Sequence, residues 1–425
     1  MTRKSLKIVI LSGNHLCHNP RVLKEAEALA EDGHKVEILT SGVNPNYLRR
    51  DNRLAHGKKW KIKALMSGLN GAQRFQIRAK RRAGNLVHRW FRLENTWQLG
   101  EIAKVLYKEA KERRADLYIA HSEPAMWAAE SLRRAGRSVG IDMEDWFSED
   151  LLPAARKTRP ISILKELEKS LLCHGVHSSC TSEAMADALV NSYGCRRPMV
   201  IRNVFLVKDR EKIDGKWRDR PWMVSWMSTN DPTMERPKDA PISIHWFSQT
   251  IGPGRGLEQL FQALEGVRGS WELHIRGNLK GYEHWLEQSC PTEVKERLRV
   301  HEQVENEELL SRIAEHDIGF AGEEKTPKSR NLTITNKLFQ YLQGGLAVVA
   351  SDTKGQIEAA QKAGGAVQLY VAGSVDSLRR ILIPLLGNSS KITHMKTDAW
   401  KAGARLSWEN EALKYKELIN RMEHD

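Results

Sequence analysis

The feature that most constrains the fold is an alternation between short apolar segments and longer amphipathic ones, which occurs twice along the chain. The short segments have the length and residue types of strands that are buried on both faces, as in a parallel sheet. In the first half of the chain they are residues 6–13, 36–40, 117–121, 139–143, 176–180 and 199–202. In the second half they are residues 242–247, 271–275, 299–303, 318–321, 347–350 and 366–370. The alternation predicts an α/β protein with two doubly wound sheets.

The amphipathic segments between these strands repeat apolar residues at helical spacing. In the first half they are residues 19–33, 97–113, 125–135, 163–172 and 183–193. In the second half they are residues 257–267, 308–314, 335–343, 355–363 and a last segment at 408–422. We therefore expect a helix between most pairs of consecutive strands, which is the connection that parallel strands require.

A polar stretch at residues 209–240, rich in Asp, Lys, Arg and Pro, separates the two alternating patterns. We therefore expect four parts: a Rossmann-like domain at 1–205, a linker at 206–240, a second Rossmann-like domain at 241–398 and a closing segment at 399–425. Sheets of this kind bind ligands beyond the carboxyl ends of their strands. The sequence thus predicts two domains that face each other across a cleft, with the last helix packing back on the first domain.

Positive charge is concentrated in one part of the chain. The formal net charge is +14, and residues 49–92 hold fourteen Lys and Arg against one acid, Asp51. This basic window therefore accounts for nearly the whole excess. Such a concentration implies an anionic partner, which is a membrane surface, a phosphorylated acceptor or nucleic acid.

The basic window also contains large apolar side chains between its charges. They are Trp60, Leu65, Met66, Phe75, Ile77, Leu86, Trp90 and Phe91. Basic residues mixed with Trp and Phe are typical of segments that lie in a membrane interface, so we predict docking on an anionic membrane. A solvated basic face is the alternative. No nucleic-acid-binding motif is present, so no nucleic acid is expected as a partner. We also expect the window to interrupt the strand–helix alternation.

Neither membrane-spanning segments nor metal motifs are apparent. The apolar run at residues 8–11 is too short for the core of a signal peptide, and no stretch of about 18 apolar residues occurs. Cys173, His174, His177 and Cys180 have metal-ligand residue types, but neighbouring residues of a strand point to opposite faces. The sequence predicts a cytoplasmic protein without a bound metal, and leaves peripheral association with the inner face of the membrane open.

Polar motifs follow three first-half strands, where a ligand would bind. Gly13 permits a tight turn after the first strand, and the helix that starts near Asn19 can receive an anion or sugar hydroxyls. The motif His121-Ser-Glu-Pro124 follows another strand, so we expect His121 at the edge of the cleft, hydrogen-bonded to a sugar hydroxyl or a phosphate. Asp142-Met-Glu-Asp145 ends the next strand, where its carboxylates would bind acceptor hydroxyls or cap a helix.

The second half contains a candidate anion site. Residues 245–256 run from a strand through a Gly-rich loop to a helix, and Arg255 adds a positive charge beside the helix start. The loop is not a P-loop, because GxxxxGK[ST] is absent. A later helix can be capped by Thr333 or Thr335, and Lys337 lies in its first turn. A cation there opposes the helix dipole and is best tolerated if an anion binds at the same amides.

These motifs resemble those of the retaining GT-B glycosyltransferases of family 4, and the likeness is spread over most of the chain. Asn19-Pro-Arg21 looks like the family's opening. His121-Ser-Glu-Pro124 matches its first-domain motif, in which a His contacts the donor sugar. Cys180-Thr-Ser-Glu183 and Ile201-Arg-Asn203 fall where the family ends its first domain.

In the second half the resemblance rests on the donor-binding segments. Residues 249–256 occupy the place of the family's phosphate-binding Arg and Lys: the Arg falls at Gln249, whereas Arg255 keeps the place of the Lys. Asn336-Lys-Leu-Phe-Gln-Tyr341, followed by Gly345-Leu-Ala-Val-Val349, looks like the donor-binding helix and its following strand.

The family's E-x7-E pair is absent, because its two positions are occupied by Leu332 and Gln340. The second Glu of the pair usually binds the donor ribose, and Gln340 can still accept a hydrogen bond. The first usually touches the sugar, and Glu323 or Glu324, a little earlier in the chain, is the candidate to replace it.

The resemblance implies an enzyme that moves a sugar from a nucleotide-diphosphate sugar to a cell-envelope, polysaccharide or lipid-linked acceptor, with retention and without a metal or other cofactor. The catalytic residues it implies are His121, Arg255 and Lys337. Those near the donor are Gly13, Gln249, Gly254, Gly256, Glu323, Glu324, Asn331, Thr335, Asn336 and Gln340. Those on the acceptor side are Arg21, Glu123, Asp142, Glu144 and Asp145.

Two other functions remain open at this point. A nucleotide-sugar epimerase can share the same fold, and it needs no acceptor. A degenerate transferase that serves as a binding subunit is favoured by the two lost carboxylates. The sequence does not identify the donor base, the sugar, the acceptor or the oligomeric state.

Overall fold

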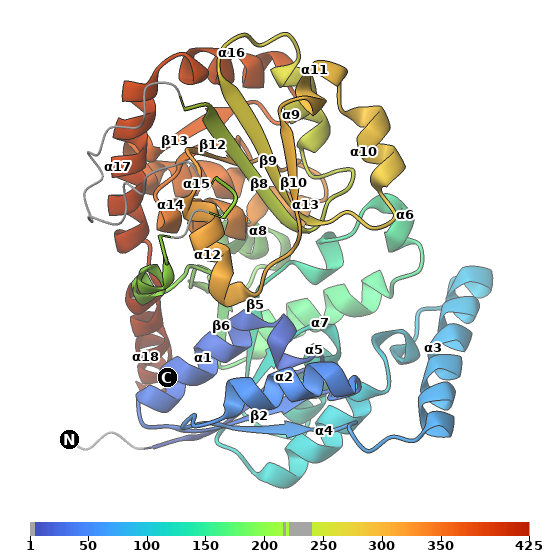
Figure 1. Cartoon of the computed structure of the whole chain (residues 1–425). Helices are drawn as coiled ribbons and strands as arrows, with labels where there is room; N and C mark the ends of the chain where they lie inside the picture. The colour runs from blue at the N-terminus through green and yellow to red at the C-terminus, as the bar shows by residue number, and fades with distance from the viewer. Residues whose placement is uncertain (1–4, 216–217, 221–239, 425) are drawn as a thin grey trace. The chain divides into compact units, whose positions relative to one another are not determined.

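The computed structural model describes residues 5–215, 218–220 and 240–424, which form two compact units (Figure 1). The first unit extends to Arg202 and also contains Pro327–Ser329 and the chain from Ala412 onwards. The second unit comprises Asn203–Thr326 and Arg330–Glu411. Each unit is built on one parallel sheet, so the prediction of an α/β protein with two Rossmann-like halves is confirmed.

The first unit contains a seven-stranded sheet in the order β3-β2-β1-β4-β5-β6-β7. All of its neighbouring strands pair in parallel, and the strand order reverses between β1 and β4, as in a doubly wound sheet. The strands are β1 Lys7–Ser12, β2 Lys35–Thr40, β3 Lys61–Ala64, β4 Leu117–His121, β5 Val139–Met143, β6 His177–Cys180 and β7 Met199–Val200. Strands β4 and β5 are buried along their whole length, because helices cover both faces of the sheet.

Helices occupy the predicted positions between these strands, and the short helix α6 Pro153–Arg156 was not predicted. The first begins at Pro20 because the side chain of Asn19 accepts a hydrogen bond from the amide of Val22. The helices are α1 Pro20–Glu31, α4 Ile102–Arg113, α5 Glu123–Arg134, α6 Pro153–Arg156, α7 Ile161–His174 and α8 Glu183–Tyr193. Three short 3-10 helices are η1 Leu16–His18, η2 Thr96–Leu99 and η3 Phe147–Glu149.

The basic window does not interrupt the alternation, which corrects the expectation from the sequence. It folds as α2 Pro45–Ala55, β3 and α3 Gly71–Phe91, and β3 pairs in parallel with β2 at the edge of the sheet. The single acid of the window, Asp51, is fully buried. It accepts hydrogen bonds from His15 Nδ1 at 2.7 Å and from the amide of Cys17 at 2.8 Å, and so fixes α2 against the turn after β1.

The second unit contains a six-stranded parallel sheet in the order β10-β9-β8-β11-β12-β13. The strand order reverses here between β8 and β11. The strands are β8 Ile242–Thr250, β9 Trp271–Asn278, β10 Leu298–His301, β11 Ile318–Ala321, β12 Ala347–Ser351 and β13 Val367–Tyr370. Trp246, Phe261 and Phe320 are among the large side chains of its buried core.

Four helices of the second unit lie where the sequence predicts them, and several others were not predicted. The predicted ones are α9 Leu257–Leu264, α12 Asn306–Ala314, α14 Asn336–Gly344 and α15 Lys354–Ala363. The others are α10 Glu283–Ser289, α11 Thr292–Lys295, α13 Lys328–Leu332, α16 Val375–Leu386 and α17 Ser389–Arg405, with the 3-10 helices η4 Val207–Lys212 and η5 Gly364–Ala366. No helix within the described ranges is both long and apolar enough to cross a membrane.

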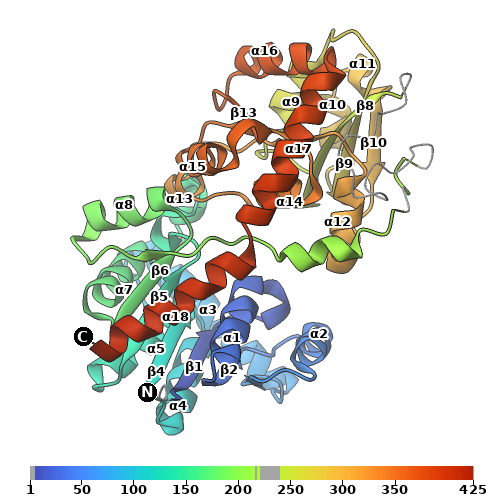
Figure 2. The same ribbon diagram turned by 90° about the vertical axis from the view of Figure 1, so that its left-hand side faces the viewer.

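The described parts of the expected linker and of the expected closing segment are included in the two units. The stretch from Asn203 to Arg220, where described, belongs to the second unit: the amide of Asp214 donates to Ser311 Oγ at 3.2 Å. Residues 221–239 of the expected linker lie outside the described residues. The last helix, α18 Trp408–His424, joins the first unit from Ala412 onwards (Figure 2). There Lys414 Nζ donates to the carbonyl of Val200 at 2.8 Å.

Candidate active site

The strongest candidate site lies at the carboxyl edge of the second sheet, where the strand order reverses. The loop that follows β8 contains Gly254 and Gly256, both with positive φ, and the loop that follows β11 begins at Gly322. A Cβ atom on Gly256 would lie 3.0 Å from the carbonyl oxygen of Gly322, so glycine allows the two loops to touch. Ligands of open α/β sheets bind at such a reversal point.

Glu323 organises the polar side chains at this edge. Its amide donates to Ser351 Oγ at 2.8 Å, which fixes its backbone against β12. Its Oε1 accepts hydrogen bonds from Lys337 Nζ at 2.9 Å and from Thr335 Oγ1 at 3.2 Å. Burial alone would raise the pKa of Glu323, but Lys337 outweighs this effect and holds the pKa below its usual value. Glu323 is therefore ionised at neutral pH.

Lys337 is the buried cation of this cluster. It lies in the first turn of α14, where a positive charge opposes the helix dipole, and the Glu323 carboxylate neutralises it. Thr335 stands at the N-cap position of α14, but its hydroxyl donates to Glu323 and accepts no hydrogen bond from a helix amide. Among the described residues, no side chain therefore caps the first amides of α14.

Arg330 completes the cluster and was missed by the sequence analysis. Its Nη1 donates to the carbonyl of Gly254 at 3.2 Å, and its Nε lies 3.9 Å from Glu323 Oε2. It thus joins the Gly-rich loop to the Glu323–Lys337 pair. Arg255, which the sequence places here together with Lys337, is exposed on the same loop. The two cations Lys337 and Arg330 and the Glu323 carboxylate therefore share this edge, and Arg255 lies on the adjoining loop. This arrangement suits a ligand with more than one negative charge.

The other residues predicted near the donor are more scattered. Gln249 is exposed at the end of β8, and Asn331 Oδ1 accepts a hydrogen bond from the amide of Lys354 at 3.1 Å. Asn336 Oδ1 accepts from Asn203 Nδ2 at 3.2 Å. Gln340 lies half-buried one turn after Lys337, and Glu324 is half-buried beside Glu323.

In the first unit, His121 is not at an exposed edge, which corrects the sequence expectation. It is the last residue of β4, its side chain is fully buried, and its Nε2 pairs with Glu25 Oε2 from the buried face of α1. Burial would lower the pKa of His121, but Glu25 raises it above its usual value. His121 therefore stabilises the packing of α1 on the sheet and has no surface for a ligand.

Asp142 and Arg21 are likewise internal. Arg21 Nε and Nη2 each donate to one Asp142 oxygen at 2.7 Å, and Ser179 Oγ donates to the same carboxylate at 2.7 Å. Burial would raise the pKa of Asp142, but Arg21 lowers it to about 2. Neither side chain is exposed, so both are engaged inside the unit in this structure, and their contact with an acceptor stays a prediction.

Glu25, His121 and Asp142 also bring potential metal-ligand atoms within 4.8 Å of one another. Both Asp142 oxygens already accept hydrogen bonds from Arg21, a fixed positive charge. A cation would have to displace that guanidinium, so the set is better described as a buried ion-pair network than as a metal centre.

Among the predicted acceptor-side residues, the partly exposed acids are Glu123, Glu144 and Asp145. Glu123 forms an ion pair with Arg159, whereas Glu144 Oε1 accepts a hydrogen bond from Asn19 Nδ2 at 3.1 Å. Burial raises the pKa of Glu144 to about 7, and burial also raises the pKa of Asp145. A carboxyl group with a pKa near 7 can both accept and donate a proton at neutral pH.

Gly13 brings the first loop of this unit against the start of α5. Its amide donates to Ser122 Oγ at 3.0 Å, and Ser122 adopts a positive φ of 83°, which is rare for residues other than glycine. A Cβ atom on Gly13 would collide with the Pro124 ring and the Ser122 hydroxyl. Both features place the two loops closer together than ordinary side chains would allow.

We expect Gly13→Ala to lower the free energy of unfolding by about 1–3 kcal/mol, because the added methyl group must displace the Pro124 ring. Urea denaturation measures the change. Gly68→Ala is the matched control, since a Cβ atom there meets nothing within 4 Å. Equal stability of the two variants would show that the contact is not tight.

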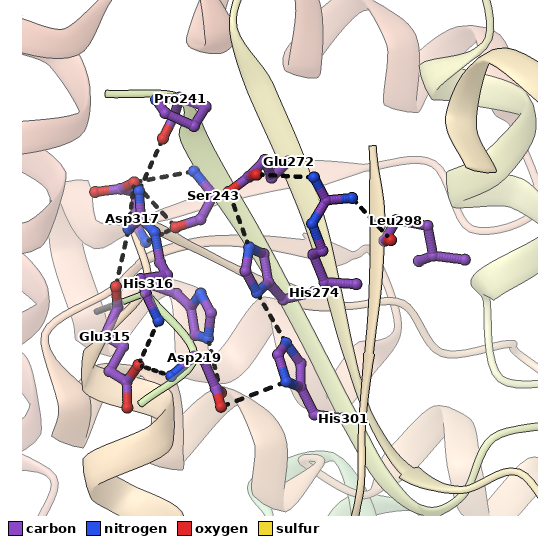
Figure 3. Close-up of polar contacts among 12 residues, drawn as sticks. Asp219, Pro241, Ser243, Glu272, His274, Leu298, His301, Glu315, His316 and Asp317 are labelled. Atoms are coloured by element: carbon purple, nitrogen blue, oxygen red, sulfur yellow. Dashed lines mark hydrogen bonds and ion pairs between the residues drawn. The ribbon is translucent and has the colours of Figure 1, made fainter. Parts of the chain in front are cut away.

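A second polar cluster lies within the sheet of the second unit and contains the four histidines His245, His274, His301 and His316. Figure 3 shows the last three of them with their polar partners. His274 Nδ1 and His301 Nε2 are 2.9 Å apart, and His301 Nδ1 lies 3.4 Å from Asp219 Oδ1. The His245 and His316 rings stack with centroids 4.4 Å apart. This cluster is buried in the unit and was not anticipated from the sequence.

Comparison with known proteins agrees with this architecture. Residues 18–203 match the model of the glycosyl transferase 4-like domain family. No curated protein sequence shows significant similarity to the chain.

Solved structures extend the likeness to nearly the whole chain. Sucrose-phosphate synthase from Thermosynechococcus elongatus has a TM-score of 0.69 at 13% identity, covering 98% of this chain and 99% of its own. HepE from Anabaena, in complex with UDP-glucose, has a TM-score of 0.67 at 15% identity, with 98% and 99% covered. WaaG, a glycosyltransferase involved in lipopolysaccharide biosynthesis, has a TM-score of 0.58 at 13% identity, with 95% and 98% covered. Residues 18–203 therefore match the glycosyl transferase 4-like domain, and the chain as a whole has the two-Rossmann (GT-B) fold of these solved structures.

Proposed function

We propose that the protein transfers a sugar from a nucleotide-diphosphate sugar, which it binds at the carboxyl edge of the second sheet. The observation that carries the proposal is the cluster of Lys337, Arg330 and Glu323 beside the uncapped start of α14. HepE, a structural neighbour, is known in complex with UDP and with UDP-glucose. A diphosphate carries the negative charge that this edge would attract.

In this proposal the second unit stabilises the leaving diphosphate. Negative charge grows on that group as the glycosidic bond breaks, and fixed donors aimed at it lower the barrier without any reorganisation. Lys337, Arg330 and Arg255 are the cations available, and the first amides of α14 add partial positive charge. Retention of configuration and independence of a metal follow from the resemblance to family 4 and remain part of the proposal.

Glu323 takes two roles as the donor binds. Without donor its carboxylate neutralises Lys337. With donor the Lys337 ammonium can turn to a phosphate oxygen, and the Glu323 carboxylate becomes free to accept a hydrogen bond from a sugar hydroxyl. Gln340, one turn further along α14, would accept one from the ribose. These contacts would replace those of the two absent carboxylates of the family.

On the acceptor side we propose Glu144 as the principal group, with Asp145 and Glu123 near it. A carboxyl group with a pKa of about 7 is suited to hold an acceptor hydroxyl. We propose a cell-envelope, polysaccharide or lipid-linked glycan as the acceptor, reached at the inner face of an anionic membrane; WaaG acts in lipopolysaccharide biosynthesis. His121 and Arg21 would act indirectly, by holding α1.

A product assay with radiolabelled UDP-, GDP- and ADP-sugars tests the proposal. A transferase releases nucleoside diphosphate and labels a glycan or lipid acceptor, and slow hydrolysis of the donor would remain without acceptor. An epimerase would change the sugar of the donor with no acceptor present. Binding without any turnover of any donor would favour a non-catalytic binding subunit and would overturn the proposal.

The internal position of His121 leads to a separate prediction. We expect His121→Ala to destabilise the protein by about 3–5 kcal/mol, because Glu25 would remain buried without its partner. The affinity of the folded variant for a nucleoside diphosphate should stay unchanged, since that ligand is assigned to the second unit. Urea denaturation and calorimetry measure the two quantities, and the exposed His56→Ala is the control. A normal stability combined with a large loss of nucleotide affinity would contradict the assignment.

A further inference from the structure

The structure divides the basic window into two halves, which differ in how far their large apolar side chains are buried. The first half comprises the residues before α3, and the second half is α3 itself. In the first half the large apolar side chains Trp60 and Met66 are buried in the unit. Two of its lysines are paired: Lys58 Nζ lies 2.7 Å from Glu27 and Lys63 Nζ lies 2.9 Å from Glu109. These residues are part of the folded edge of the sheet, so their apolar side chains are not available to insert into a lipid bilayer.

The second half, α3, presents large apolar side chains to solvent. Phe75, Leu86 and Trp90 are 68%, 52% and 75% exposed. They are spaced by eleven and four residues, which is about three turns and one turn, so they lie on one side of the helix over about 22 Å. An aligned stripe of this size differs from the single exposed apolar residues that every protein surface contains.

The opposite side of α3 is the one that anchors the helix. Gly84 lies nine residues from Phe75, about half a turn away around the axis. Its carbonyl accepts a hydrogen bond from Asn95 Nδ2 at 3.1 Å, and the buried His88 ring contacts Gln98 at 2.9 Å through Nδ1. The apolar stripe therefore faces away from the rest of its unit, in line with the free position of α3 in Figure 1.

Arginines border the stripe. Arg78, Arg82 and Arg89 are spaced by four and seven residues, so they form a row beside Phe75, Leu86 and Trp90. All three are exposed, and within the described residues none forms an ion pair with an acid. A positively charged border along an apolar stripe matches the headgroup layer and the acyl boundary of an anionic membrane.

We propose that α3 is a docking surface for an anionic phospholipid bilayer, with Phe75, Leu86 and Trp90 inserted at the acyl boundary and the bordering arginines on the headgroups. It rests on the proposed function, in which the acceptor is reached at a membrane. The row of arginines beside the apolar stripe favours a membrane over the other possible partners. A protein partner would not require three arginines along the whole stripe. A nucleic acid would not require the apolar residues.

Vesicle flotation with purified full-length protein tests the proposal. Wild type should float with vesicles of phosphatidylcholine and phosphatidylglycerol at low salt, float poorly with phosphatidylcholine alone, and lose binding at high salt through screening. Two variants should each lose binding at least about a hundredfold, one through charge and one through apolar contact. They are Arg78→Gln/Arg82→Gln/Arg89→Gln and Phe75→Ser/Leu86→Ser/Trp90→Ser.

The matched control removes the same charge from the other half of the window. In Lys58→Gln/Lys59→Gln/Lys61→Gln the bilayer affinity should fall by less than about tenfold. Equal loss in the control and in the arginine variant would overturn the proposal in favour of a diffuse basic surface, as would wild type that stays in the soluble fraction at low salt. All variants should keep the wild-type thermal midpoint, because the changed side chains are exposed or partly exposed.

Turnover is measured in parallel on a water-soluble glycan acceptor. The α3 variants should keep wild-type turnover on it while failing to float. If wild type floats but no donor is turned over, the proposed transfer fails and the docking surface stands. If turnover is found but no flotation, the docking surface fails and the proposed transfer stands.

Discussion

Replacing Lys337 with alanine is expected to lower turnover by about a hundredfold or more, which corresponds to about 3 kcal/mol of transition-state stabilisation. Lys337 is buried beside the uncapped start of α14, where water screens its charge little. Initial rates at saturating donor measure the effect. Lys354→Ala, an exposed lysine in the first turn of neighbouring α15, is the matched control and should keep normal turnover.

Because Lys337 is paired with Glu323, a double variant is needed as a further control. Removal of Lys337 leaves the Glu323 carboxylate enclosed without its cation, which could distort the site by itself. Lys337→Ala/Glu323→Gln removes that charge, so its turnover should remain low if the ammonium acts on the diphosphate. Recovery of turnover in the double variant, or unchanged turnover in folded Lys337→Ala, would exclude the proposed role.

Glu323→Gln alone distinguishes the two roles of the carboxylate. The neutral amide no longer holds Lys337, so the affinity for a bare nucleoside diphosphate should be kept or increased. Turnover should fall, because the amide is a weaker acceptor for a sugar hydroxyl than a carboxylate. Calorimetry and initial rates together separate these effects.

The helix start that holds Lys337 could be predicted from the sequence, but the partners of that side chain could not. The position of Lys337 follows from a helix start after a predicted strand. Its pairing with Glu323, fourteen residues earlier, depends on Ser351 Oγ at the end of β12, and no local pattern connects these residues. Arg330 was missed because a single Arg in a polar stretch is usually solvated. Its position at the site depends on the hydrogen bond that it donates to the Gly254 carbonyl, which only the folded loop reveals.

His121 shows the same limit at the other sheet. The end of a strand was predicted correctly, but the depth of the side chain depends on Glu25 of α1. A signal was present: Glu25 lies three residues after Val22 and four before Leu29, on the apolar face of the helix. An acid in that position needs a buried partner, so it could have indicated that one of the nearby polar residues is internal.

Helices without strong patterns account for most of the missing fold. α16 contains Pro384, which normally argues against a helix. In α17 the large apolar residues of the buried stripe are confined to Ile392 and Met395, and the rest of the stripe is small or polar, such as Ala399 and Gly403. Both helices are stabilised by packing against the second sheet and not by local propensity. By contrast, β4, β5, β11 and α8 have the predicted boundaries, because each has an uninterrupted apolar pattern or a clear cap.

The four-histidine cluster predicts that the second unit loses stability on acidification. Burial, followed by the neighbouring His316, keeps the pKa of His245 well below its usual value, and burial does the same for His316. For His301, burial lowers the pKa to about 4. Both ring nitrogens of His245 and of His316 lack a hydrogen-bond partner among the described residues, so these rings are buried in the neutral form.

The sign of the effect follows from proton binding. The unfolded chain takes up protons at His245, His301 and His316 near pH 6.5, whereas the folded unit takes them up only at lower pH. The stability that these three residues provide is therefore present above pH 6.5 and is lost as the pH falls below it. Each histidine that stays neutral costs about 1.4 kcal/mol per pH unit below its unfolded pKa. Glu315 opposes this trend, because burial raises its pKa to about 7 and the folded unit therefore binds its proton first.

The charged groups around the rings do not remove the effect. Asp219 and Asp317 attract a proton to the cluster, but Arg220 and Arg276 lie in the same network and repel it. Glu272 is hydrogen-bonded to His274 and faces Arg299, and its pKa lies below its usual value because of the His274 hydrogen bond. Because the nearby acids and bases oppose one another, desolvation is the main cause of the lowered pKa of His245 and His316.

His245→Phe/His316→Phe isolates the contribution of the two stacked rings. At pH 7.5 this variant should be at least as stable as wild type, because it removes four buried polar atoms that have no hydrogen-bond partner. Between about pH 7.5 and pH 5, the free energy of unfolding of wild type should fall relative to the variant by about 4 kcal/mol, or about 2 kcal/mol for each ring. Urea denaturation at several pH values gives both curves, and comparing them cancels the contributions of Glu315 and of every other group that the two proteins share. Parallel curves would show that the two rings take up protons in the folded unit as easily as in the unfolded chain, and the acid sensitivity would then have to arise elsewhere.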